Sequence, residues 1–238
     1  MKRAVVTAAA TACLSRLTGE DGGAGGLQAV EAAEVALVLG MTAAVVTLSS
    51  GTGPVVIWGE NPMSASLVDL QLTLGEGPVI DAGAGTSIVL EPSLRDVPLT
   101  RWAAFTTEAE TLGVRAVFAF PLRLGVISIG ALMLHRDTVG PMTADQQGDG
   151  LVIADAITLT LMIDELNPSS PTSALGAGGL DPADVSAVVH QATGMISVQL
   201  DISVADALVR LRAHAFSSAR PIRAIATDVV QRRLRFHA

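Results

Sequence analysis

The sequence VSAVVHQATGMISVQLDISVADALVRLRAHAFSSARPIRAIATDVVQRRLRF, from Val185 to Phe236, contains three successive helical patterns separated by short breaks. Apolar residues of the first pattern recur every three or four residues, as on one face of an amphipathic helix, and they are Val185, Val188, Val189, Ala192, Met195 and Ile196. Ser203 is a favoured N-cap for the second helix, and Pro221 suits the first position of the third. Because none of these helices can bury its apolar stripe alone, we predict that they pack into a three-helix unit.

The charge of this C-terminal stretch differs from that of the rest of the chain. Residues 180–238 contain seven Arg and five Asp, a formal charge of +2, whereas residues 1–179 contain eight Lys or Arg and eighteen Asp or Glu, a formal charge of −10. From Arg210 onward, seven arginines meet a single acid, Asp228. A basic helical unit on an acidic chain indicates a polyanionic partner, and nucleic acid is the first candidate. A solvated arginine face is the alternative interpretation.

Several short motifs of this unit match a known pattern in all three helices. They are Gln191–Met195, Asp201–Ser203, Ala205–Ala207, Leu211–Arg212, Ala215 and Ile225–Val230. These residues resemble an ANTAR domain, a three-helix RNA-binding module. The resemblance implies that the unit prevents transcription termination by stabilising a hairpin in nascent RNA. Thr193 stands where many members have Lys, and His214 stands where many have an aromatic residue.

The resemblance and the charge pattern together suggest which side chains contact RNA. Arginine pairs with phosphate and also stacks on splayed loop bases, which suits a hairpin. The six candidates are Thr193, Arg212, His214, Arg220, Arg223 and Arg232.

The preceding residues alternate between helical and strand patterns. We predict an N-terminal helix and a glycine-rich connector over residues 1–24, although Lys2-Arg3 and the apolar residues after it also fit a short signal peptide. Helical or amphipathic patterns then cover 27–39, 67–74, 99–112 and 143–166, and strand patterns cover 43–48, 55–58, 87–90, 115–122 and 126–134. Residues 167–179 are rich in Pro, Ser and Gly and are predicted to be a linker.

Short motifs within residues 25–166 carry a second resemblance. They are Leu74–Ala82, Gly113–Ala116, Phe120–Leu122 and Ile129–Leu132. With the order of the elements, they resemble a GAF domain, an α+β sensor fold with an antiparallel sheet. In the GAF–ANTAR proteins of actinobacteria the position of Val79 is often Cys, so the resemblance implies that thiol chemistry at this position is absent here.

A sensor fold suggests a small-molecule pocket on the sheet. The candidate lining residues are Trp58, Asp81, Trp102, Phe105, Arg115 and Phe118. The alternative is that the aromatic residues fill the core, as most aromatic residues do. A degenerate GAF domain that serves only dimerisation is a further alternative.

Motifs of catalysis and metal binding are missing from the sequence. None of the four histidines has a metal-ligand partner at helical spacing, and Cys13 is the single cysteine. The chain has no HExxH, P-loop, GxSxG or CxxC motif. We therefore expect no enzymatic activity, no bound metal and no cofactor.

The sequence thus predicts an α+β, GAF-like sheet domain with flanking helices at 25–166, followed by a small all-α, three-helix ANTAR-like domain at 180–238. The expected function is that of a cytoplasmic, RNA-binding antitermination regulator. The alternative is a ligand-sensing or scaffolding GAF dimer whose C-terminal helices make only protein contacts. The 143–166 helix and the N-terminal helix are apolar on several faces, which predicts a homodimer. No apolar run reaches eighteen residues, so we expect no membrane segment.

Overall fold

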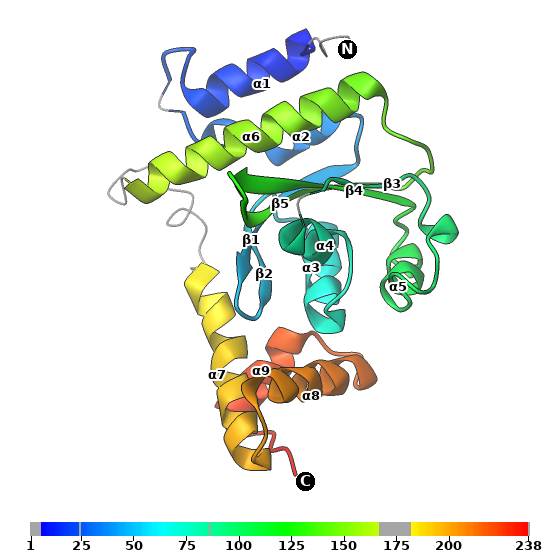
Figure 1. Cartoon of the computed structure of the whole chain (residues 1–238), viewed down its shortest axis with the longest axis vertical. Coiled ribbons are helices and arrows are strands. Elements are labelled where there is room, and N and C mark those ends of the chain that lie inside the picture. Colours follow the sequence, from blue (N-terminus) through cyan, green and yellow to red (C-terminus); the bar gives the residue numbers. More distant parts are fainter. Residues whose placement is uncertain (1–5, 24, 86, 167–181, 238) are drawn as a thin grey trace.

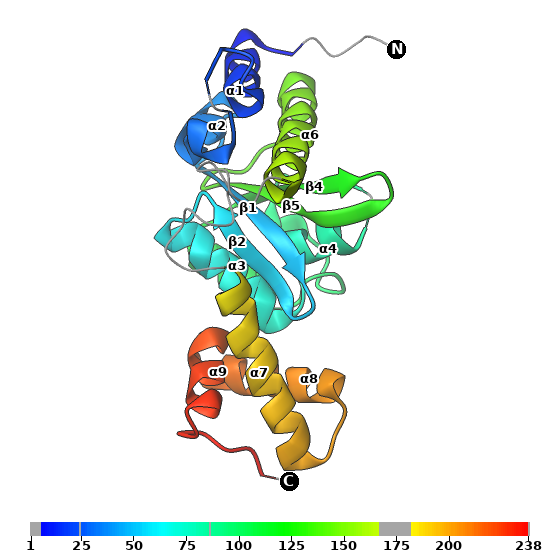
Figure 2. The same ribbon diagram turned by 90° about the vertical axis from the view of Figure 1, so that its left-hand side faces the viewer.

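The computed structural model describes residues 6–23, 25–85, 87–166 and 182–237 (Figure 1). Within these ranges five strands form one antiparallel sheet in the order β2-β1-β5-β4-β3. The strands are β1 (Ala43–Ser50), β2 (Gly53–Trp58), β3 (Val89–Glu91), β4 (Ala116–Leu124) and β5 (Ile127–Arg136). The sheet separates two layers of helices, and a third group of helices lies beyond one end of it (Figures 1 and 2).

The first helical layer consists of α1 (Ala8–Thr18), α2 (Ala32–Val38) and α6 (Ala144–Leu166). The helix α1 is tied to α6, because the backbone N–H and the hydroxyl of Thr7 both donate to the Asp149 carboxylate, at 3.0 and 2.7 Å. At the other end of α1, the Thr160 hydroxyl donates to the Leu17 carbonyl at 3.2 Å. The N-terminal helix therefore packs within its own chain.

The second layer consists of α3 (Pro62–Leu74), α4 (Pro78–Ala84) and α5 (Phe105–Thr111). Strand β4 serves both layers, because successive side chains point to opposite faces of a sheet. Phe118 and Phe120 pack toward α1, α2 and α6, whereas Val117 and Ala119 pack toward α3, α4 and α5. Being buried on both faces, β4 is an almost continuous apolar segment.

Three differences from the predicted elements have local causes. The predicted helix over 27–39 is split into a 3₁₀ turn (Leu27–Ala29) and α2, because Val30 is extended and its carbonyl accepts the Trp58 indole N–H at 3.2 Å. Pro78 begins α4, a helix that is not among the elements predicted from the sequence. The predicted 99–112 helix begins only at Phe105, where the Glu76 carboxylate accepts the backbone N–H groups of Ala104 and Phe105, both at 2.9 Å.

The C-terminal unit, residues 182–237, contains α7 (Pro182–Leu200), α8 (Val204–Ser217) and α9 (Ile222–Val230) around one apolar core. The Ser203 hydroxyl accepts the Asp206 backbone N–H at 3.1 Å, which confirms the predicted N-cap of α8. Pro221 is the N-cap of α9 rather than its first helical residue. The predicted linker, 167–179, lies outside the described residues.

Among the described helices, no single one is long and apolar enough to cross a membrane. The bent pair Ala187–Leu200 and Val204–Ser217, with 105° between its members, has the necessary length and composition only when the two are taken together.

Candidate functional site

Arg212 joins the C-terminal unit to the sheet domain, by which we mean residues 6–166. From α8 its Nε donates to the Leu72 carbonyl at 3.0 Å, and its Nη2 donates to the Thr52 carbonyl at 3.4 Å. Leu72 lies in the last turn of α3, where carbonyls lack helical partners and carry partial negative charge. Burial lowers the pKa of the Arg212 guanidinium. Arg212 therefore caps a helix of the other domain.

Gly75 gives the guanidinium the space it needs. This residue ends α3 with φ of 71°, a left-handed conformation that suits glycine. A Cβ atom at Gly75 would lie 2.8 Å from Nη1 of Arg212. The backbone at Gly75 thus forms part of the site that holds the Arg212 guanidinium.

Two further contacts cross the same junction. The Leu72 side chain, 3% exposed, belongs to the apolar core of the C-terminal unit, so α3 acts as a fourth helix of that unit. Arg223 of α9 places its Nε 3.1 Å from Oδ1 of Asp69, on α3. Both atoms are buried, and their relative orientation makes an ion pair without a hydrogen bond. Burial raises the pKa of Asp69, and the Arg223 charge acts in the opposite direction.

The other predicted RNA contacts lie in different surroundings. Thr193 is 1% exposed and its hydroxyl donates to the Val189 carbonyl at 2.7 Å, so in this arrangement it offers no surface to a partner. The half-buried His214 ring lies edge-on to Phe236, with 5.2 Å between the ring centroids. Arg220 and Arg232 are exposed. The structure therefore divides the six candidates among the junction, the interior and the surface.

A single carboxylate partly neutralises the exposed arginines. Asp228 accepts from Nη2 of Arg220 at 2.7 Å and from Nε of Arg233 at 2.8 Å, and these hydrogen bonds lower the pKa of Asp228. Within the described residues no ion pair involves Arg210, Arg232 or Arg235. Arg210 and Arg235 were not among the predicted contacts, and their positions off the apolar stripes are the sequence signal that could have found them.

The six predicted pocket residues do not line one cavity. Trp58 and Phe118 belong to the apolar cluster under α1, α2 and α6, whereas Trp102 and Phe105 belong to the cluster under α3, α4 and α5. Arg115 donates to the carbonyls of Glu110 and Val114, at 2.8 and 3.0 Å, at the end of α5. The predicted single pocket is therefore wrong, because the sheet itself separates its aromatic residues.

Asp81 and Trp102 do come together. The Asp81 carboxylate accepts from the Trp102 indole N–H at 3.2 Å and from Nε and Nη2 of Arg101 at 3.2 and 3.1 Å. The Arg101 guanidinium lies 4.3 Å from the Trp102 ring centroid. The polar groups of this cluster are thus partners of one another, and they hold the loop before α5 against α4.

Two titratable side chains buried outside the junction, His135 and Cys13, have pKa values shifted by burial. His135 is 2% exposed, its Nε2 has no hydrogen-bond partner, and burial lowers its pKa to about 4. Burial is also the main cause that raises the pKa of the Cys13 thiol. In the part of the chain that the structure describes, no group of three or more His, Cys, Asp or Glu side chains could hold a metal ion.

Comparison with known proteins identifies the fold of the sheet domain. Neither a family model nor a curated protein sequence matches this chain. The GAF domain of a phosphoenolpyruvate-protein phosphotransferase from Coxiella burnetii superposes with a TM-score of 0.52 at 13% identity, covering 69% of this chain and 100% of that one. The GAF domain of an Acinetobacter phosphoenolpyruvate-protein phosphotransferase gives a TM-score of 0.48 at 12% identity, covering 68% of this chain and 98% of that one.

At such low identity the first of these similarities establishes a fold and no activity. The five-stranded antiparallel sheet with its flanking helices has the GAF fold. The α+β class and the GAF-like architecture predicted from the sequence are therefore confirmed. The C-terminal helices follow this domain in the chain.

Proposed function

We propose that this chain is an RNA-binding transcription antitermination regulator, in which the C-terminal unit binds hairpin RNA under the control of the GAF domain. The observation behind the proposal is a group of exposed arginines on a three-helix unit that resembles ANTAR, and none of them forms an ion pair with another described residue: Arg210, Arg232 and Arg235. Guanidinium groups at the surface bind phosphate and release counterions from RNA. A nascent transcript as partner implies a cytoplasmic protein.

The junction supports control by the sensor. Two of the predicted RNA contacts, Arg212 and Arg223, are engaged by α3 when the C-terminal unit is docked. Undocking would expose both guanidinium groups and raise the positive charge that RNA meets. A signal acts on such an equilibrium when it binds one arrangement better than the other.

A homodimer is the second part of the proposal. Among the described side chains of α6, four large apolar ones remain exposed, with exposed fractions between 36% and 61%: Leu151, Val152, Leu159 and Ile163. We infer that a second copy covers this face, which would place two basic units in one particle and favour an RNA with two hairpins. We assign this dimer interface to α6 rather than to α1, because α1 already packs on α6 of its own chain.

The alternative function is a ligand-sensing or scaffolding dimer whose C-terminal helices make only protein contacts. The engagement of Arg212 and Arg223 by α3 favours this alternative, because both then serve the fold. The exposed Arg210, Arg232 and Arg235 are what it leaves unexplained.

A salt titration separates the two functions. A fluorescent two-hairpin RNA is titrated with the full-length chain over a range of salt concentrations. We expect binding that weakens steeply with salt, and a triple Arg-to-Ala variant at 210, 232 and 235 should lose about tenfold or more in affinity and up to about three units of log–log salt slope. The control variant is Arg95→Ala, which removes one exposed guanidinium from the sheet domain and shows the effect of losing a positive charge outside the C-terminal unit.

Two results would count against RNA binding by this surface. If the triple variant bound RNA as the wild type does, these arginines would be a solvated face. If the wild type bound no structured RNA at low salt, the protein-contact alternative would replace the proposal.

A further inference from the structure

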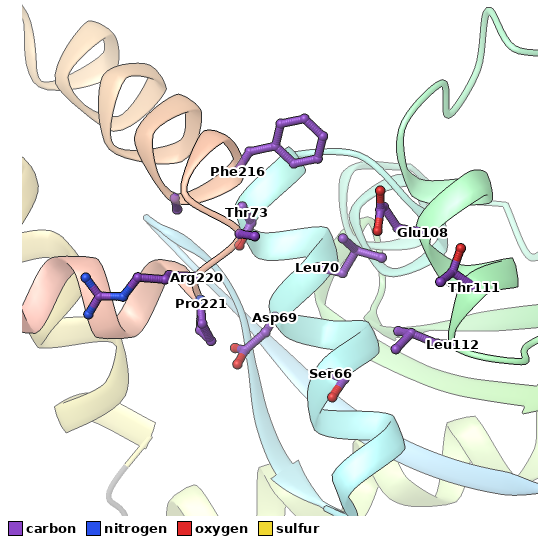
Figure 3. Close-up of a pocket in the computed structure, with 12 residues that line it drawn as sticks. Ser66, Asp69, Leu70, Thr73, Glu108, Thr111, Leu112, Phe216, Arg220 and Pro221 are labelled. Carbon is purple, nitrogen blue, oxygen red and sulfur yellow. The ribbon is translucent and has the colours of Figure 1, made fainter.

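A groove of about 400 Å³ opens where the sheet domain meets the C-terminal unit. One wall is formed by α3 and α5, and the other is formed by the end of α8 and the turn into α9 (Figure 3). A volume of this size lies at the lower end of the range for small-molecule sites, which is roughly 300–1,000 Å³. Because both domains contribute walls, the groove exists in this form only while the C-terminal unit is docked.

The apolar part of the groove comes from both domains. Phe216 of α8 is 49% exposed and Leu112, at the end of α5, is 37% exposed, and both line the groove with Leu70 of α3. Large apolar side chains that remain exposed around one concavity are typical of a ligand site. They provide a surface for a flat, apolar body.

The charged part of the groove is left with one negative group. Asp69 forms an ion pair with Arg223, and Arg220 pairs with Asp228. In Figure 3 the Arg220 side chain points away from Leu70 and Glu108. The Glu108 carboxylate has neither an ion pair nor a hydrogen bond among the described residues, and it lines the groove from α5. The occupant that complements this wall carries a positive charge.

One of the two helix ends at the groove also favours a positive charge. Helix α5 ends at Thr111 and α8 ends at Ser217, and the groove is lined by residues at or next to both ends. The C-terminal end of a helix carries partial negative charge, which stabilises a cation placed beside it. The end of α8 therefore acts in the same direction as the Glu108 carboxylate, whereas at the end of α5 the Arg115 guanidinium already donates to the Glu110 carbonyl.

We propose that this junction groove binds a small organic cation with an aromatic body, an arylalkylamine, whose ammonium group meets Glu108 and whose ring packs on Phe216 and Leu70. Because the bound molecule touches both domains, it binds the docked arrangement better than the undocked one and stabilises docking. This inference rests on the sensing role proposed for the GAF domain, and it makes no use of RNA binding.

The test uses tryptamine as the probe and the full-length chain without RNA. Binding is followed by ligand-observed NMR and by calorimetry, with indole-3-propionate as a probe of the same ring and opposite charge. We expect tryptamine to bind and the carboxylate to fail. Glu108→Gln and Phe216→Ala should each weaken tryptamine binding by about tenfold, the scale of one lost charge-assisted or aromatic contact.

A control variant separates the groove from the general charge of α5. Glu110→Gln removes a carboxylate from the same helix that faces Arg95 outside the groove, and it should bind tryptamine as the wild type does. Equal effects of Glu108→Gln and Glu110→Gln would overturn the proposal. So would a wild type that binds no tryptamine at millimolar concentration, or one that binds the carboxylate equally well.

The consequence for docking is measured as a distance. Fluorophores on Leu99→Cys and Val198→Cys, both at exposed positions on different domains, report domain separation in a Cys13→Ala background. Tryptamine should increase the docked fraction, and an unchanged or smaller docked fraction would overturn the stabilising role. Failure of RNA binding in the salt titration would leave these results intact, so the two proposals fail separately.

Discussion

Replacing Arg212 by Ala should release the C-terminal unit from the sheet domain. In the docked arrangement the Arg212 guanidinium donates to the Leu72 carbonyl at 3.0 Å and to the Thr52 carbonyl at 3.4 Å. Alanine removes both hydrogen bonds and leaves a carbonyl of the last turn of α3 without its cap. The Leu72 side chain and the ion pair between Arg223 and Asp69 are among the junction contacts that remain.

The size of the effect follows from the contacts. A hydrogen bond from a charged donor contributes about 1.5–3 kcal/mol, and the bond at 3.4 Å is too long to add much. The Arg212 side chain is only partly buried, so we assign it a contribution of about 2 kcal/mol to the free energy of docking. Losing this contribution lowers the ratio of docked to undocked molecules about 30-fold.

The assay is the distance between fluorophores at Leu99→Cys and Val198→Cys in the Cys13→Ala background. Arg212→Ala should shift the distribution toward longer distances, and Arg212→Lys should lie between it and the wild type because an ammonium keeps the charge and loses the fork of donors. The control is Arg210→Ala, which removes an exposed guanidinium from the same helix. Among the described residues, Arg210 forms no ion pair with the sheet domain. A distribution for Arg212→Ala equal to that of the wild type, or equal effects of the two alanine variants, would refute the reasoning.

Further predictions concern stability, assembly and RNA contact. Burial lowers the pKa of His135 from 6.5 to about 4, so the unfolded chain takes up this proton first as the pH falls. The free energy of unfolding should therefore be about 3 kcal/mol lower near pH 4 than above pH 6.5 on account of His135. Urea unfolding at the two pH values measures this decrease, and the decrease should be smaller in His135→Leu. Glu76→Ala removes the acceptor of two backbone N–H groups at the start of α5. We expect the free energy of unfolding to fall by about 1–2 kcal/mol. An unchanged urea midpoint would argue against this capping role. Leu159→Lys with Ile163→Lys should convert a dimer into a monomer by light scattering, and a dimeric mass for this double variant would exclude the exposed α6 face as the interface. Thr193→Val should leave RNA affinity unchanged because the hydroxyl is buried in α7, and a loss of affinity without a loss of stability would contradict that placement.

Local patterns in the sequence determined most of the elements and much of the architecture. The apolar periodicity of α7, α8 and α9, the Ser203 cap and the two hairpins of the sheet all depend on residues close together in the chain. The short motifs within residues 25–166 were sufficient to indicate a GAF-like fold, which the structural comparison confirms. Elements specified by neighbouring residues can be predicted because their hydrogen bonds and apolar stripes are formed within one segment.

Tertiary structure alone decided the positions of the functional side chains. Arg212 and Arg220 look alike in the sequence, yet one caps α3 from another domain and the other pairs with Asp228 at the surface. Trp58 and Trp102 were placed in one pocket and lie on opposite faces of the sheet. Periodicity tells which residues face inward from an element, but a contact also requires the position of the partner element, and that is set by packing between segments far apart in the chain. For this reason the charge of the C-terminal unit could be predicted from its sequence, whereas the division of its arginines between junction and surface could not.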